Sequence, residues 1–252
     1  MAFLRCDFRS QQLQMQTSMQ VVFPQGEPLG QIPVVYLLHG LSDNATCWQR
    51  QVPVERYALK HKLAIVMPEV QRSWYTDMAQ GLRYFSYIHQ ELPDFCHDTF
   101  GLSQKREQNY VMGLSMGGYG AMKCALTQPF RYAGAASFSG ALRVDTRLAR
   151  YSGDPQMLRE WAAITGHTDE QLGPVADLRD LAQKAAAQDK LPALYLTCGE
   201  QDLLLDANHS FVETLKECGI QHTYEQWPGA HTWEFWQDSL EKALERFFGD
   251  EG

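Results

Sequence analysis

Short apolar runs alternate with amphipathic stretches along most of the 252-residue chain. Short runs of β-branched or apolar residues predict strands. These predicted strands are 34–38, 63–67, 109–113, 133–138, 193–198 and 222–227. Two further stretches, 3–9 and 15–23, precede the first predicted helix and indicate antiparallel edge strands. Strands that alternate with helices are typical of a mostly parallel sheet covered by helices on both faces.

The segments between these strands show helical spacing of apolar residues. A helix is predicted over 85–96, where Pro93 should kink or restart it because proline removes a backbone donor. Segments 205–218 and 233–248 also predict helices, and the second has an apolar face that includes two tryptophans.

One segment, 141–190, contains helical pieces at 155–164 and 176–187 but no convincing strand. An insertion after the fifth α/β strand would lie above the carboxyl ends of the sheet. We therefore predict a single domain over residues 1–252, with 141–190 as a small cap rather than a second domain.

The stretch YVMGLSMGGYGAM, residues 110–122, carries a strand into a glycine-rich turn and then into a helix. Gly113 and Gly117 flank Ser115 at the spacing G-x-S-x-G, which leaves room for a serine on a strained strand-to-helix turn. The turn also places the serine at a helix N-terminus, where the Met116 N–H can face a developing negative charge. Ser115 is therefore the candidate nucleophile.

A nucleophilic serine needs a base and an orienting carboxylate, which follow it in this fold in the order acid, then histidine. Of the eight histidines, His231 lies in a loop between the last predicted strand and the last helix. The acid should follow the preceding strand, where Glu200, Asp202 and Asp206 are all candidates.

The loop after the 34–38 strand is the candidate source of a second oxyanion donor. We expect the Leu41 N–H to act together with the Met116 N–H. His39 is expected to be a packed, hydrogen-bonded residue that shapes this loop. Asp43 and Asn44 are expected to hold the loop through side-chain-to-backbone hydrogen bonds.

The charge, the cysteines and the motifs of the chain limit its binding partners, its location and its cofactors. The formal net charge of −8 argues against nucleic acid or an anionic membrane surface. The six cysteines form neither a CxxC pair nor a disulfide framework, and the first residues contain no apolar run typical of a signal peptide. We therefore expect a cytoplasmic protein. No HExxH, GxGxxG or carboxylate cluster indicates a metal or dinucleotide, so no cofactor is expected.

Six motifs in order resemble the esterase D-type branch of the α/β-hydrolases: YLLHGLSDNATCW, SWYTDMAQG, GLSMGGYGAMK, SFSGAL, CGEQD and GAHTWEFW. They are most similar to bacterial tributyrin (short-chain acyl) esterases and more distantly similar to S-formylglutathione hydrolases. The resemblance implies an eight- or nine-stranded hydrolase sheet and a catalytic triad of Ser115, Asp202 and His231. It also implies an oxyanion hole at Leu41 and Met116.

The function implied is a serine carboxylesterase that hydrolyses short-chain acyl esters through an acyl-enzyme, with a small-molecule ester as partner and no cofactor. A homo-oligomer is consistent with the resemblance. A thioesterase of the S-formylglutathione type and an acyltransferase are alternatives on the same triad. A non-catalytic binding protein with this fold is a further alternative.

Three aromatic residues are candidates for the substrate pocket. Trp74 and Tyr75 follow a predicted strand in the SWYTDMAQG motif, a loop that lies near the site in the resembling family. Trp48 follows the predicted oxyanion loop. Covering the edge of the sheet is the alternative role for all three.

Overall fold

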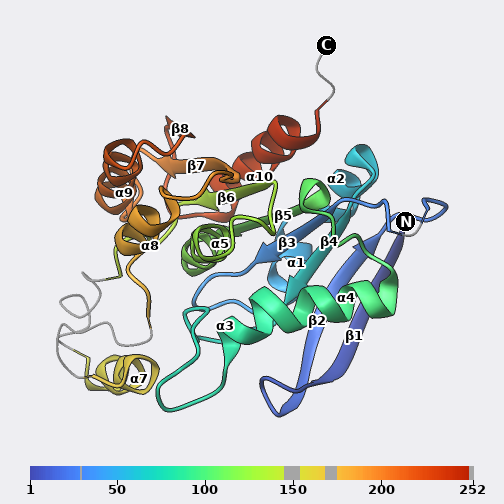
Figure 1. The fold of residues 1–252 in the computed structure, drawn as a ribbon, viewed down its shortest axis with the longest axis horizontal. Coiled ribbons are helices and arrows are strands. Elements are labelled where there is room, and N and C mark those ends of the chain that lie inside the picture. The colour runs from blue at the N-terminus through green and yellow to red at the C-terminus, as the bar shows by residue number, and fades with distance from the viewer. Residues whose placement is uncertain (29, 145–153, 168–174, 250–252) are drawn as a thin grey trace.

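The computed structural model describes residues 1–28, 30–144, 154–167 and 175–249. Its described strands form one eight-stranded sheet in the order β1-β2-β4-β3-β5-β6-β7-β8 (Figure 1). The strands are β1 (Ala2–Ser10), β2 (Met15–Phe23), β3 (Val34–Leu38), β4 (Ala64–Pro68), β5 (Asn109–Leu114), β6 (Gly134–Phe138), β7 (Ala193–Gly199) and β8 (His222–Trp227). All eight predicted strands are confirmed.

Strand direction follows the predicted pattern. β4, β3, β5, β6, β7 and β8 pair in parallel, whereas β1 and β2 join the sheet by antiparallel pairing. The carboxyl ends of the parallel strands therefore meet at one edge of the sheet, where the loops after several strands can build a common site.

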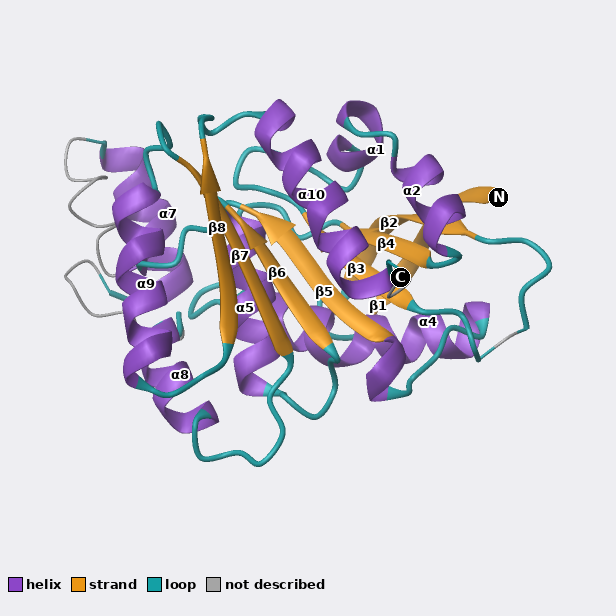
Figure 2. Cartoon of the chain, turned by 90° about the horizontal axis from the view of Figure 1, so that it is seen from above, coloured by secondary structure: helices purple, strands orange, loops and turns teal. Residues whose placement is uncertain are grey.

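Helices cover both faces of the sheet (Figure 2). One face carries α1 (Cys47–Gln51), α2 (Val54–His61) and α10 (Trp233–Phe248), and the other carries α4 (Leu92–Phe100), α5 (Met116–Thr127), α8 (Leu178–Ala185) and α9 (Leu205–Glu217). Strand β3 shows how the sequence fits this arrangement. Val34, Tyr36 and Leu38 join the core cluster on the α5 side. Val35 and Leu37 join the cluster on the α10 side, because successive side chains of a strand point to opposite faces.

The predicted helix over 85–96 is interrupted, as its proline suggested. A short helix, α3 (Tyr84–Ser86), continues through a π-helical turn at Tyr87–Glu91 before α4 begins at Leu92. Pro93 occupies the first turn of α4, where its missing N–H leaves no helical hydrogen bond unmade. The sequence pattern did not predict α1 or α2. These helices form the crossover that the parallel neighbours β3 and β4 require.

The described part of segment 141–190 contains α7 (Pro155–Thr165) and α8, in agreement with the predicted helices. Helix α7 packs against the loop after β4, where Ala79 N donates to Ile164 O at 3.0 Å and Gln80 N to Ala163 O at 2.8 Å. Residues 145–153 and 168–174 of the predicted cap lie outside the described residues, so its role as a cap stays a prediction. None of the described helices has the length and apolar character needed to cross a bilayer.

Candidate active site

Ser115 occupies the turn between β5 and α5 in a strained backbone conformation. Its φ is 51° and its ψ −115°, a region that non-glycine residues rarely adopt. Three hydrogen bonds hold this turn, including Ser115 N to Phe138 O at 2.9 Å and Ala141 N to Ser115 O at 2.9 Å. A Cβ on Gly117 would lie 2.4 Å from Leu38 O. The flanking glycine thus allows α5 to begin directly against the end of β3.

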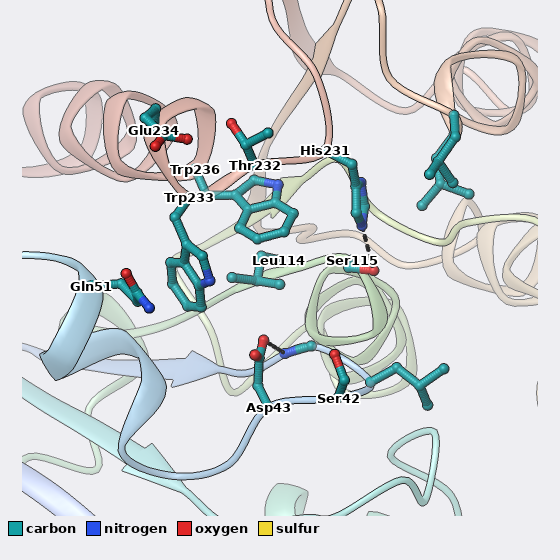
Figure 3. A pocket seen from close by; sticks show the side chains of 14 residues that line it. Ser42, Asp43, Gln51, Leu114, Ser115, His231, Thr232, Trp233, Glu234 and Trp236 are labelled. Carbon is teal, nitrogen blue, oxygen red and sulfur yellow. Dashed lines mark hydrogen bonds between the residues drawn. The ribbon is translucent and has the colours of Figure 1, made fainter.

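The structure brings Ser115, His231 and Asp202 together from three loops, and Figure 3 shows His231 pointing at Ser115. His231 Nε2 lies 3.1 Å from Ser115 Oγ, and its Nδ1 lies 2.9 Å from Asp202 Oδ2. The acceptor carboxylate assigns the ring proton to Nδ1, so that Nε2 can accept the serine hydroxyl proton. The Trp236 ring lies perpendicular to the His231 ring, with the ring centroids 4.8 Å apart.

The Asp202 side chain is fully buried, whereas 22% of the His231 side chain is exposed. Burial raises the pKa of Asp202, but hydrogen bonds from His231 and from the Leu204 N–H outweigh it and leave the pKa below its usual value. The carboxylate is therefore ionised at neutral pH and can stabilise a positive charge on His231.

The other two candidate acids do not reach His231. Glu200 is exposed, and its backbone N–H binds Trp227 O. Asp206 is exposed in the first turn of α9, where it complements the helix dipole. Helix α9 has no side-chain cap, so Asp206 does not cap its N-terminus.

Gln201 ties the acid loop to the histidine loop, a contact that the sequence analysis did not predict. Its N–H donates to Gly229 O at 2.9 Å, and its side-chain Oε1 accepts from Gly229 N at 2.8 Å. The two hydrogen bonds fix the separation between the turn that carries Asp202 and the loop that carries His231. The only sequence signal was the position of Gln201 directly before Asp202.

The loop after β3 is held by hydrogen bonds on both sides of Gly40. Asp43 Oδ2 accepts from Gly40 N at 3.1 Å, as predicted, and His39 Nδ1 lies 2.8 Å from Gly40 O. Val70 N donates to His39 Nε2, which assigns the ring proton to Nδ1. In a trans peptide the C=O and N–H point in opposite directions, so anchoring Gly40 O turns the Leu41 N–H away from His39. His39 is 1% exposed, which confirms its predicted role in shaping the loop.

Ser115 and His231 open onto a cavity of about 610 Å³ (Figure 3). Its wall also contains Leu41, together with Asp43, Gln51 and the two tryptophans of α10, Trp233 and Trp236. The spacing of apolar residues predicted that both tryptophans lie on the core face of the last helix, and no sequence signal identified Gln51. No lysine or arginine is among the described residues that line this cavity.

The three aromatic residues predicted for the pocket do not line this cavity. Trp48, Trp74 and Tyr75 are at most 2% exposed. Trp48 Nε1 donates to Leu38 O at 3.0 Å, and Tyr75 OH donates to His39 O at 2.9 Å. Trp48 therefore supports the end of β3 and Tyr75 the loop after it, whereas the Trp74 ring packs against Tyr119 and Trp161. These positions correct the predicted place of the three residues in the cavity wall.

Among the described residues, no group of three or more His, Cys, Asp or Glu side chains is placed to hold a metal ion. The expectation that no cofactor takes part rests on the sequence motifs alone.

The chain matches the family model described as "Putative esterase" over residues 10–247. It is 27% identical to an acetyl esterase of Caldicellulosiruptor saccharolyticus over 263 residues, covering 97% of each chain. The substrate-bound structure of FphF, a fluorophosphonate-binding serine hydrolase of Staphylococcus aureus, has a TM-score of 0.88 at 33% identity and covers 99% of both chains. The S-formylglutathione hydrolase FrmB of the same organism has a TM-score of 0.83 at 32% identity, covering 98% of both chains.

These similarities extend over nearly the whole chain. They confirm the resemblance to esterase D-type hydrolases that its motifs predicted. They favour an enzyme over the non-catalytic binding protein considered above. The chain belongs to the esterase family, has the α/β-hydrolase fold and is a carboxylesterase of the serine hydrolase type.

Proposed function

We propose that the protein hydrolyses short-chain carboxylic esters with Ser115 as nucleophile, His231 as general base and Asp202 as the acid that orients the base. The observation that carries this proposal is the continuous hydrogen-bonded chain from Asp202 through His231 to Ser115. Each member has the protonation state that its role requires, because the buried carboxylate fixes the proton of His231 on Nδ1.

In the proposed reaction, Ser115 Oγ attacks the ester carbonyl while His231 Nε2 takes its proton. The Leu41 and Met116 N–H groups stabilise the oxyanion, and His231 then protonates the departing alcohol. Water attacks the acyl-enzyme with His231 again as base, and the carboxylic acid leaves. The Met116 N–H suits this role because it belongs to the first turn of α5, where N–H groups have no helical partner.

The pH dependence of kcat/KM between about pH 5 and 8 tests the assignment of a histidine base. Activity should rise with pH because only neutral His231 can act as a base. Asp202 should add no second step, because its pKa lies below the ordinary value for a carboxyl group. Initial rates with p-nitrophenyl acetate at constant ionic strength test this expectation. A flat profile over the range would contradict a histidine base.

The charge of the cavity favours esters of neutral alcohols over glutathione thioesters, the second candidate substrate class. Asp43 and Glu234 line the cavity, and its described residues include no lysine or arginine. S-Formylglutathione carries two carboxylates and one ammonium group, so carboxylates in the cavity should repel it. We expect kcat/KM for p-nitrophenyl acetate to exceed that for S-formylglutathione by at least about tenfold. Equal or reversed values would favour the thioesterase assignment.

Acyl chain length should have a large effect on rate. We expect acetate and butyrate esters to outpace decanoate esters by about a hundredfold or more in kcat/KM. A buried methylene contributes only about 1–3 kcal/mol, so such steep rejection would require a closed end to the acyl pocket. A series of p-nitrophenyl esters measured below their solubility limits tests the prediction. Equal rates on long chains, or activation at an emulsion surface, would indicate a lipase.

The proposal also covers the cap over the site, the cellular location of the protein and its partners. The segment 141–190 is proposed to cap the site, and the packing of α7 on the loop after β4 supports a position on that side of the sheet. A cytoplasmic location is supported by six cysteines that are all free. Small-molecule esters are the proposed partners, without nucleic acid, and a homo-oligomer stays a prediction.

A further inference from the structure

Lys123 is a buried lysine to which the proposed mechanism gives no role. It lies in α5 and is 3% exposed, and its burial lowers its pKa to about 8. Its Nζ donates to Tyr75 O at 2.9 Å and to Thr76 Oγ1 at 3.1 Å and lies 4.4 Å from the centroid of the Phe85 ring. Burying an ammonium group is costly unless its hydrogen bonds are satisfied, and two of these acceptors belong to one turn of the loop after β4.

That turn is strained. Trp74 and Tyr75 are consecutive non-glycine residues with φ values of 53° and 47°, a conformation that costs free energy and persists only where surrounding contacts impose it. The Lys123 ammonium supplies one such contact by binding the Tyr75 carbonyl. Gly120, one turn earlier in α5, supplies another, because a Cβ there would lie 2.5 Å from the Tyr75 ring.

The strained turn points the Tyr75 hydroxyl at the oxyanion loop. Tyr75 is fully buried, and its OH donates to His39 O at 2.9 Å. The next carbonyl along the chain, Gly40 O, is bound by the His39 ring. Two successive carbonyl groups are thus anchored directly before the Leu41 N–H, so its direction depends on the Tyr75 hydroxyl as well as on His39.

We propose that Lys123 is a positioning residue for the oxyanion hole: it holds the Trp74–Tyr75 turn, which places the Tyr75 hydroxyl against the loop that carries the Leu41 N–H. Lys123 lies about two helical turns after Ser115 on α5. The helix that begins at the nucleophile therefore also sets the position of the facing oxyanion donor. This inference rests on the proposed function.

The test compares Lys123→Met, Tyr75→Phe and the double variant with the unmodified enzyme. Complete titration with a fluorophosphonate counts reactive sites, so that kcat is expressed per site. We expect each single variant to lower kcat by about 10- to 100-fold, because small displacements of an oxyanion donor act on the transition state. KM for p-nitrophenyl acetate should change by less than about twofold, and the double variant should be no slower than the slower single variant.

Tyr87→Phe is the matched control. Tyr87 is also fully buried, but among the described residues its hydroxyl makes no hydrogen bond to the oxyanion loop. It should lose little kcat even if its melting temperature falls. A purely structural role for Lys123 would lower the melting temperature and the number of titratable sites while leaving kcat per site unchanged.

Three results would overturn the inference: unchanged kcat per site in Tyr75→Phe, a higher KM at constant kcat, or single-variant losses that multiply in the double variant. If Lys123→Met does not fold, Tyr75→Phe alone decides by the first two criteria. Ser115→Ala distinguishes this failure from failure of the proposed function. If it abolishes activity while Tyr75→Phe leaves kcat intact, only the role of Lys123 and Tyr75 is wrong.

Discussion

Ser115→Ala is expected to lower kcat by about 10⁶-fold, the scale of loss when a triad serine is removed from a serine hydrolase. The structure gives the reason, because Ser115 Oγ lies 3.1 Å from His231 Nε2 and no other atom of the turn can take its place as nucleophile. Rates with p-nitrophenyl acetate, measured on protein purified apart from any wild-type enzyme, test the prediction. The melting temperature should change little, since the hydroxyl is not part of the backbone hydrogen bonds that hold the turn.

Covalent labelling is a second test of Ser115 as the nucleophile. A fluorophosphonate should add once to the wild-type protein, and mass spectrometry should place the adduct on Ser115. Ser42 lines the same cavity and is the internal comparison, because a reagent that merely binds there could modify either hydroxyl. An adduct on Ser42, or full activity in Ser115→Ala, would show that the nucleophile has been misassigned.

Asp202→Asn is expected to lower kcat by about 10³–10⁴-fold, the scale seen when a triad aspartate is neutralised. Asp202 Oδ1 accepts from the Leu204 N–H at 2.8 Å, and Oδ2 faces His231 Nδ1. In the variant, the amide oxygen should keep the bond to Leu204, which places the NH₂ group against Nδ1. An amide donor there shifts the histidine proton to Nε2, and the base can then no longer accept the proton of Ser115.

Asp206→Asn and Glu200→Gln are the controls, because each removes one nearby carboxylate that does not contact His231. Both should change kcat by less than about tenfold. Asp206→Asn should also lower the free energy of unfolding by about 0.3–1 kcal/mol through the weaker interaction with the helix dipole. A large loss of kcat in either control, with little loss in Asp202→Asn, would identify a different acid and leave Ser115 and His231 in place.

The fold could be predicted because its signals are local. The apolar runs of β3 to β7 are short and bounded by turn residues, so their positions follow from the sequence alone. The G-x-S-x-G turn is also local, since its strain needs glycines at fixed distances from Ser115. The order of serine, acid and histidine then follows from chain order and fold.

The cavity wall could not be predicted in the same way. Trp233 and Trp236 follow the apolar spacing of a core helix, yet both line the cavity, because His231 lies two residues before the start of α10. Trp74 and Tyr75 lie in a motif that suggested the pocket, but two consecutive left-handed residues turn both side chains into the core. Backbone reversals of this kind depend on distant partners such as Lys123, and periodicity carries no information about them.

The sheet order also affects how the enzyme acquires its activity during folding. The hydrogen bond between His231 and Ser115 joins residues 116 positions apart. The histidine loop follows β8, which lies at one edge of the sheet and, among the strands that the structure describes, pairs with β7 alone. Contacts of such long sequence separation form late, because the chain must close a large loop before they contribute free energy. During refolding, recovery of the catalytic rate should therefore follow the pairing of β8 with β7, not the collapse of the chain.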